Sequence, residues 1–436
     1  MKAPLLTQVR PCYFSADCGM AYIMRLENGK FAIIDGNIGE RDEPEHLYSL
    51  LCSQCEGEVT VEAWFITHPH DDHFCGFARF AQAYREKVKI EKVIYNFPKP
   101  GVFDSEGSDP SEFFSALDAL NTEIVTAKTG DTYNFGGARF DVLFTCEDLY
   151  PGPVKNINNS SIVMMMELGR YKTLWLGDLQ REGAERLCAN TPKNKLKCDI
   201  LQVGHHGYGG GSDELYRAAD PEILLWPCPD FWFHSVRLWE CNDYLISSKN
   251  IKATFVAGQR ERVFDLTKDI KCTPDYEKKD VSSQVCGDSL TALEWSCLTG
   301  GRTGYAPAEL EFSPSGLTLR AGEAYTLCQL LQRGQTAMSE RFTFELCGTL
   351  GRADVFGLLF DSVEPMQAFA DELCDLPRES EFNFRLEIDR AARTAKLYNF
   401  GKLIKEKQNI FPDPRDVILV LKNAEVKIKK AEYKPE

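Results

Sequence analysis

The sequence predicts an α+β chain with two domains, a pair of sheets covered by helices followed by an antiparallel β-sandwich. The chain has 436 residues, enough for two or three domains. Strand and helix patterns alternate over residues 1–270, which favours stacked sheets with helices outside. Short strand patterns between turn signals dominate residues 301–436, as in an antiparallel β-sandwich. Residues 271–300 are predicted to be a linker, because Lys271–Val285 is polar and charged.

The N-terminal domain is predicted to begin with a β-hairpin. Two apolar segments, Met20–Leu26 and Phe31–Ile34, flank Asn28-Gly29, a dipeptide typical of tight hairpin turns. Helices and strands then follow in turn. The patterns predict helices near Glu43–Cys55, Phe77–Lys87 and Ser111–Leu120, and strands at Val61–Ile66 and Val88–Phe97.

The second half of this domain is predicted to be richer in strands. The predicted strands are Ala138–Phe144, Ser161–Leu168, Lys172–Leu176, Asp199–Val203, Glu222–Pro227 and Ala253–Ala257, with helices at Gln180–Cys188, Asp213–Ala219 and Leu238–Ser247. In the C-terminal domain the predicted strands are Glu309–Phe312, Leu317–Leu319, Arg341–Leu346, Val355–Phe360, Phe382–Ile388, Thr394–Tyr398 and Val417–Leu421.

Composition narrows the class of protein and of partner. The net charge of −15 disfavours nonspecific binding to nucleic acid. No apolar stretch approaches membrane-span length, and the N-terminus lacks a signal-peptide pattern. The sixteen cysteines are scattered, with one lone CxxC at Cys52 and Cys55. We therefore expect free thiols and a cytoplasmic protein, with a disulfide-stapled secreted protein as the alternative. The sequence leaves the oligomeric state open.

A histidine-rich segment predicts a metal site. Residues 67–74 read Thr-His-Pro-His-Asp-Asp-His-Phe and follow the apolar run at Val61–Ile66. Imidazole and carboxylate together suit zinc, iron and manganese. The spacing allows His68 and His70 to bind one ion, and Asp72 and His73 to bind another. The alternative is a polar turn with solvated histidines, but three of the chain's seven histidines fall here.

Two further strand ends carry polar residues. The apolar run Leu174-Trp175-Leu176 ends in Gly177-Asp178, and the strand predicted at Asp199–Val203 runs into Gly204-His205-His206-Gly207. Taken alone, an Asp at a strand end more often caps the following helix. The order of the three motifs along one αβ pattern favours metal ligands instead.

The ordered motifs resemble the metallo-β-lactamase superfamily of hydrolases, whose signature is His-x-His-x-Asp-His, and most of all its competence-type, ComEC-like branch with the related phosphocholine esterases. The resemblance covers roughly residues 8–268 and implies an αββα sandwich. It rests on Asn28-Gly29-Lys30 with Ile34-Asp35-Gly36, His68–His73, Asn158–Val163 with Gly177-Asp178, and Val203–Gly207.

The resemblance implies a role for each matching residue. His68 and His70 would bind a first ion, and Asp72 and His73 a second, with Asp178 bridging the two. His206 is the chosen remaining ligand, and His205 would lie beside the substrate, although sequence alone does not order this pair. Asp35 would support the ligands by accepting an imidazole N–H.

The chain departs from its relatives in two places. Many superfamily members have another histidine between the second and fourth motifs, but none lies between His73 and His205. The first ion would then have His68, His70, Asp178 and water, with Asn158 or Asn159 nearby. The branch usually shows Gly-Asp-Ala before its second strand, where this chain has Gly19-Met20-Ala21.

The resulting hypothesis is a hydrolase with two divalent ions, zinc first and manganese or iron as alternatives. A metal-bridged hydroxide would attack a phosphodiester or phosphate ester in a small-molecule or glycan-linked substrate. His205 or His234 would donate to a substrate oxygen. One alternative is a thioester or lactam hydrolase of the same superfamily. Another is a carbohydrate- or protein-binding protein that uses the C-terminal sandwich, which weakly resembles concanavalin-like or laminin-G domains.

Overall fold

The chain divides into two compact units. Unit 1 comprises Met1–Pro229 with Trp239–Glu277, and unit 2 comprises Asp230–Leu238 with Lys278–Glu436. Within the described residues, no helix is both long and apolar enough to cross a membrane. The computed structural model describes residues 2–11, 19–99, 109–149, 156–229, 233, 236, 240–258, 260–271, 290, 293–297, 308–324, 326–332, 341–359, 380–389, 391–408 and 417–435.

Unit 1 contains two mixed sheets. In the first sheet, the strands from β3 to β7 pair in parallel, and those from β3 through β2 and β1 to β15 pair antiparallel. In the second sheet, the strands from β8 to β11 pair antiparallel, and those from β11 to β14 pair in parallel. The first sheet has the order β15(Arg262–Asp265), β1(Leu5–Gln8), β2(Ala21–Arg25), β3(Phe31–Asp35), β4(Val59–Ile66), β6(Lys92–Tyr95), β7(Glu123–Thr126), with β5(Val88–Ile90) also beside β4. The second has the order β14(Ala253–Val256), β13(Ile223–Trp226), β12(Ile200–Gln202), β11(Tyr171–Trp175), β10(Val163–Leu168), β9(Ala138–Phe144), β8(Thr132–Phe135).

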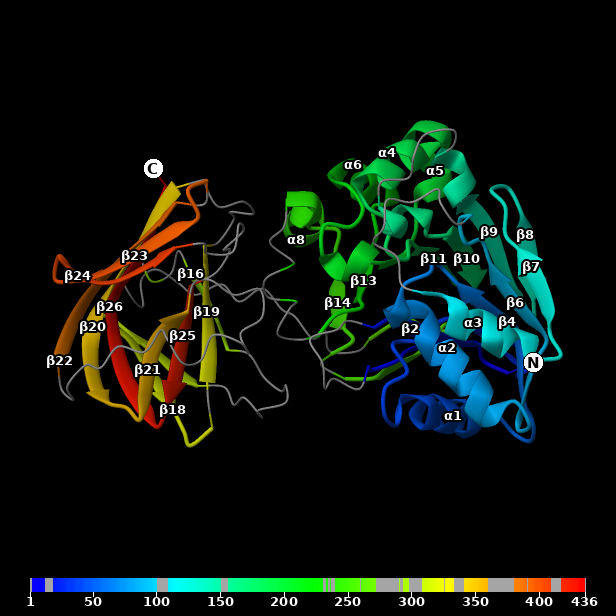
Figure 1. Ribbon diagram of the computed structural model, residues 1–436, viewed down its shortest axis with the longest axis horizontal. Coiled ribbons are helices and arrows are strands. Elements are labelled where there is room, and N and C mark those ends of the chain that lie inside the picture. Colours follow the sequence, from blue (N-terminus) through cyan, green and yellow to red (C-terminus); the bar gives the residue numbers. More distant parts are fainter. Residues whose placement is uncertain are drawn as a thin grey trace. The chain divides into compact units, whose positions relative to one another are not determined.

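Alternating side chains build two apolar layers around the first sheet. Tyr22 and Met24 face the second sheet and join its side chains in one core, whereas Ala21 and Ile23 face the helices. Figure 1 shows α1(Glu43–Gln54), α2(Asp71–Tyr84) and α3(Ser111–Asp118) on one outer side, and α4(Arg181–Asn190), α5(Lys193–Leu196) and α6(Asp213–Ala219) on the other. The predicted αββα sandwich is confirmed.

Unit 2 is an antiparallel β-sandwich, as predicted, with one core between its two sheets. The smaller sheet has the order β16(Leu293–Cys297), β19(Thr326–Gln332), β25(Val417–Lys422), β21(Val355–Leu359). The larger has the order β17(Glu309–Ser313), β18(Gly316–Ala321), β26(Ala424–Pro435), β20(Arg341–Arg352), β22(Ser380–Asp389), β23(Thr394–Asn399), β24(Lys402–Gln408). Its likeness to concanavalin-like or laminin-G domains stays a prediction.

Several element boundaries differ from the sequence-based expectation. Helix α2 begins at Asp71, six residues before the predicted start at Phe77, because acidic residues in a first turn are stabilised by the helix dipole. Strand β16 lies inside the predicted linker and pairs with β19. The predicted strand at Val88–Phe97 is interrupted at Glu91. The structure describes no part of residues 272–289. The predicted helix at Leu238–Ser247 is a 3-10 turn, η4(Glu240–Asn242), followed by α8(Asp243–Ser247). Besides β16, the strands that the patterns missed are β1, β7, β8, β15, β19, β24 and β26.

Two glycines let α2 lie directly against the end of β3. The Gly36 N–H donates to the His73 carbonyl at 2.8 Å, and the Gly76 N–H donates to the Asn37 carbonyl at 3.0 Å. A Cβ atom on Gly76 would lie 1.6 Å from the Gly36 carbonyl oxygen. The close contact therefore fixes the helix that carries Asp72 and His73.

We predict that Gly76→Ala destabilises unit 1, although alanine favours a helix interior by about 1 kcal/mol. The steric overlap outweighs this gain and should lower the free energy of unfolding by about 3 kcal/mol. Urea unfolding followed by circular dichroism measures the change. Gly322→Ala is the control, because no atom of the described part of the chain lies within 4 Å of a Cβ built there. A Gly76→Ala protein as stable as wild type would contradict the close contact.

Candidate metal centre

The histidine-rich segment is a short loop followed by a helix. Strand β4 ends at Ile66, and α2 begins at Asp71 with His70 as its extended N-terminal flanking residue. Asp72 and His73 therefore lie in the first helical turn rather than in a loop. The His73 N–H donates to the His70 carbonyl at 3.0 Å. The helix and the loop together aim their polar side chains at one place.

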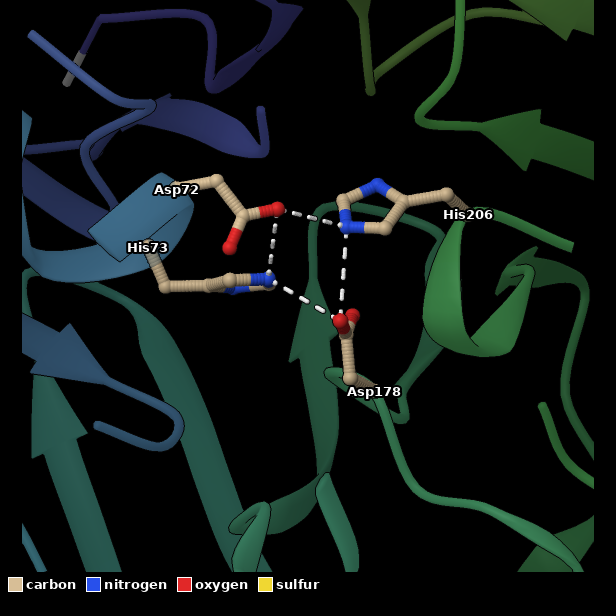
Figure 2. A group of neighbouring side chains, drawn as sticks. All are labelled: Asp72, His73, Asp178 and His206. Carbon is tan, nitrogen blue, oxygen red and sulfur yellow. Dashed lines mark ion pairs between the residues drawn. The ribbon is translucent and has the colours of Figure 1, made fainter. Parts of the chain in front are cut away.

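Four of the predicted ligands converge on one group (Figure 2), formed by Asp72, His73, Asp178 and His206. The Asp178 Oδ2 atom lies 3.2 Å from His73 Nε2 and 3.3 Å from His206 Nε2. The Asp72 Oδ2 atom lies 3.1 Å from His206 Nε2 and 3.7 Å from His73 Nε2. Two imidazoles and two carboxylates from three separate segments thus face each other.

A second group shares the same carboxylate. It consists of His68, His70 and Asp178. The Asp178 Oδ2 atom lies 3.8 Å from His68 Nε2, and His68 Nε2 lies 3.0 Å from His70 Nδ1. Asp178 is therefore common to a set of four residues and a set of three, the arrangement expected of a bridging ligand between two ions.

The donor atoms fit divalent metal ions. Among the described residues, His73 Nε2, His206 Nε2 and Asp178 Oδ1 are buried without a hydrogen bond, although the two nitrogens face carboxylate oxygens at 3.1–3.7 Å. Buried polar atoms are rarely left without a partner, because each lost hydrogen bond costs about 1–3 kcal/mol. Imidazole nitrogen and carboxylate oxygen are the ligands that zinc and similar ions take in proteins. Binding of ions would satisfy the three atoms together.

Asp35 lies behind the ligands, where the sequence placed it. Its Oδ2 atom is 2.8 Å from His73 Nδ1, and its Oδ1 atom accepts the Thr67 N–H at 2.7 Å. The Thr67 hydroxyl also donates to Asp35 at 2.8 Å. With Nδ1 held by Asp35, the Nε2 atom of His73 is directed toward Asp178. The sequence reasoning missed Thr67, whose only signal is its place directly before His68.

The two adjacent histidines take different positions. His206 belongs to the four-residue group, and its Nδ1 lies next to the Pro227 carbonyl. His205 Nε2 is 3.9 Å from Asp178 Oδ2, and its ring lies between Asn158 and Gln180 at 3.1 and 3.2 Å. Both histidines have positive φ, 47° and 55°. Such backbone strain in residues other than glycine is concentrated at functional sites.

Of the remaining residues predicted for the site, Asn158 and Asn159 have different surroundings. Asn158 contacts His205, and its Oδ1 atom is buried without a hydrogen-bond partner among the residues that the structure describes. Asn159 instead accepts the N–H groups of Gln180 and Gly183 at 3.1 Å each, and so stabilises the start of α4. His234 lies outside the described residues.

The buried charges shift each other's pKa. Burial disfavours the imidazolium of His73 and of His206, but Asp178 and Asp72 outweigh it. They hold the pKa of His73 well above its usual value and raise the pKa of His206 to about 10. Burial likewise disfavours the Asp178 carboxylate, yet His206 and His73 hold its pKa well below the usual range. Burial and the nearby His73 lower the pKa of His68.

We predict that metal binding near pH 7 displaces protons. His73 and His206 have raised pKa values, so both carry a proton at pH 7 before an ion binds. Ligand imidazoles must be neutral, so binding should release about two protons, and affinity should rise as the pH approaches 10. Titration calorimetry in two buffers of different ionisation enthalpy counts the protons.

His46→Ala is the control for proton release. His46 pairs with Glu261 at 2.7 Å, and this contact raises its pKa although it belongs to neither ligand group. This variant should release as many protons as wild type. A binding enthalpy that does not depend on the buffer would contradict the charged His–Asp cluster.

Comparison with known proteins gives a family match and a similar curated protein. Residues 19–224 match the family model of the metallo-beta-lactamase superfamily. The chain is 30% identical over 161 residues to ComE operon protein 3 of Bacillus subtilis (strain 168), a match that covers 37% of this chain but only 19% of that protein. The chain thus spans about a fifth of the length of this relative.

Solved structures resemble parts of the chain at low sequence identity. The metallo-beta-lactamase fold protein YhfI from Bacillus subtilis aligns over 51% of this chain and 85% of its own, with 11% identity and a TM-score of 0.34. The carbohydrate binding module CBM66 from Bacillus subtilis aligns over 33% of this chain and 96% of its own, with 12% identity and a TM-score of 0.25.

Proposed function

We propose that this chain is a metal-dependent hydrolase of phosphodiesters or phosphate esters, since residues 19–224 match the family model of the metallo-beta-lactamase superfamily. The observation that carries the proposal is the shared Asp178, whose Oδ2 lies within 3.2–3.8 Å of three imidazole nitrogens. A carboxylate common to two ligand groups supports two ions side by side. Zinc is the first choice of metal, with manganese or iron as alternatives.

The two ligand groups would hold the ions unequally. His68 and His70 with Asp178 would hold one ion, whereas Asp72, His73 and His206 with Asp178 would hold the other. The first group offers three side chains and the second offers four. The first ion therefore has more room for substrate oxygens, which favours a substrate that presents several oxygens, such as a phosphate ester. Bound ions would polarise the ester and lower the pKa of water, so that it attacks at neutral pH.

The protein side chains around the ligands set protonation and orientation. Asp35 and the Pro227 carbonyl each hold the Nδ1 side of a ligand imidazole, which leaves Nε2 of His73 and of His206 for the ion. Asp72 keeps its carboxylate ionised, because His73 outweighs the effect of burial and lowers the Asp72 pKa. Only ionised carboxylates are good ligands, so the lowered pKa keeps Asp72 in the form that can bind an ion.

His205 is the candidate for proton transfer to or from the substrate. Burial lowers the pKa of His205, so the ring is neutral at pH 7. Asn158 and Gln180 hold the ring at 3.1 and 3.2 Å. A neutral imidazole held beside the ligand groups can donate a hydrogen bond to a phosphoryl oxygen or accept a proton there.

The charge of the chain favours a small substrate. A net charge of −15 repels a polyanionic backbone at long range. A small-molecule or glycan-linked ester carries fewer charges and can reach the site with little repulsion. We therefore propose such an ester rather than long nucleic acid.

We predict that the purified chain binds divalent metal and hydrolyses bis-p-nitrophenyl phosphate when manganese is added, whereas a lactam and a thioester react far more slowly. Asp178→Ala removes the ligand common to both groups. It should lower kcat at least about 100-fold, the upper end of the effect of supporting residues. Metal analysis and release of p-nitrophenol measure the two effects.

Asp71→Ala is the matched control for this experiment. Asp71 is an exposed acid in the same helical turn as Asp72, but it belongs to neither ligand group. Its replacement should leave kcat and metal content unchanged. If no ester is hydrolysed and Asp178→Ala changes neither metal content nor any activity, the proposed function is wrong. Faster turnover of the lactam or thioester would favour the alternative chemistry.

A further inference from the structure

Gln202 is a fully buried amide side chain that none of the ligand groups explains. It is the last residue of β12, four residues before His206. Its neighbours along the strand, Leu201 and Val203, are apolar and fully buried. Burial of an amide is costly unless its hydrogen bonds are made inside the protein.

Gln202 makes four hydrogen bonds that join two strand ends. Its Oε1 atom accepts the N–H groups of Leu176 and Gly177 at 2.8 Å each. Its Nε2 atom donates to the carbonyls of Gly177 at 2.9 Å and Val203 at 2.8 Å. An amide has two acceptor sites and two donors, so its capacity is fully used. The partners are the residues just before Asp178 and just before Gly204-His205-His206.

The bonds are made where the regular sheet pairing stops. The register between β11 and β12 pairs Thr173 with Ile200 and Leu174 with Leu201, and ends there. Beyond it the two strand ends separate into the loops that carry Asp178 and His206. The Gly177 carbonyl also accepts the His205 N–H at 3.1 Å. Gln202 therefore continues the link between the strands by side-chain bonds.

We propose that Gln202 is a positioning residue that holds Asp178 and His206 at ligand spacing. This inference rests on the proposed metal centre. Without the amide, the Leu176 and Gly177 N–H groups lose their buried acceptor, and the two loops lose a direct connection. The spacing between Asp178 Oδ2 and His206 Nε2, now 3.3 Å, would then vary. Supporting residues of metal sites typically change affinity 10–100-fold.

Gln202→Met tests the proposal in the full-length chain, because methionine has a similar length and cannot make these bonds. The matched control is Gln8→Met. Gln8 is also fully buried in unit 1, but its amide donates to the Trp226 and Phe255 carbonyls, both at 3.4 Å, and not to the segments that carry Asp178 and His206. Manganese and zinc affinities are measured by titration. Hydrogen exchange of residues 174–178 and 203–207 reports the link itself without metal.

The expected result has two parts. Gln202→Met should lower metal affinity at least about 10-fold and speed up exchange in both segments, whereas Gln8→Met should do neither at a similar loss of melting temperature. Unchanged exchange in both segments overturns the inference whether or not metal binds. If wild type binds metal and Gln202→Met binds it with equal affinity, the inference is also overturned. A wild type that binds no metal contradicts the proposed function, and exchange then still decides whether Gln202 links the loops.

A separate feature of unit 2 is a pair of facing thiols. Cys297 on β16 lies directly opposite Cys328 on β19 in the antiparallel register. Cys328 is buried, Cys297 is partly buried against the same core, and their thiols hydrogen-bond to each other. Opposed residues of antiparallel strands have Cα atoms about 4.5–5.5 Å apart, within the range of disulfides.

We infer that Cys297 and Cys328 form a site for a cross-strand disulfide, although every described cysteine is a free thiol. With glutathione disulfide as oxidant, Cys297 as thiolate attacks one glutathione sulfur and releases one glutathione. The Cys328 thiolate then attacks the Cys297 sulfur of the mixed disulfide and releases the second. Two thiols are oxidised, one disulfide is reduced, and the protons pass to the two glutathione thiols.

Peptide mapping after incubation of the full-length chain with glutathione disulfide tests this site. A peptide pair linked through Cys297 and Cys328 is expected, together with a higher melting temperature that reductant reverses. Cys297→Ala should abolish the linked pair and the rise. Cys347→Ala, which removes another partly buried thiol on β20, should retain both. Absence of the linked pair in folded wild type overturns the inference.

Discussion

The position of the Asp178 carboxylate is the constraint on which the rest of the centre depends. Three imidazole nitrogens, from His68, His73 and His206, lie within 3.8 Å of one of its oxygens. An isolated carboxylate at 1% exposure would favour its neutral form. The imidazolium groups reverse this effect and keep it charged. The helices and strands around Asp178 therefore serve to bring the imidazoles close to its carboxylate.

Different elements of the fold position the side chains around Asp178. Helix α2 brings Asp72 and His73 by its first turn and is seated against β3 by the contact of Gly36 with Gly76. The parallel strands β11 and β12 end side by side, so Asp178 and the histidine pair leave the sheet at the same edge. The positive φ of His205 and of His206 turns the chain sharply there. The strain is offset by the hydrogen bonds of Gln202 and by the contact of His206 with Pro227.

The sequence predicted the residues that converge at the candidate centre better than it predicted the residues that support them. The ligands stand in short motifs at strand ends, and a buried strand followed by polar residues is a local signal that His68–His73 and Gly177-Asp178 both carry. Thr67 and Gln202 act through contacts with residues far along the chain, so no local pattern marks their roles. The start of α2 was predicted too late, because its first turn is polar and its apolar spacing becomes visible only from Phe74 onward. Short strands such as β1 and β15 form because they pair with neighbours distant in sequence.

The charge pairs also explain how the centre can exist before an ion arrives. Asp178 and Asp72 lie opposite His73 and His206, and the raised pKa of both histidines means that each carboxylate faces a proton-bearing ring. Opposite charges in contact avoid the large cost of burying either one alone. The protons on His73 and His206 thus balance the charge of the two carboxylates, as divalent ions would do after binding. Two apolar cores pack around the first sheet of unit 1, and these ion pairs lie beside them. In the proposed centre, ions and protons would compete for His73 and His206, which would link the occupancy of the centre to pH.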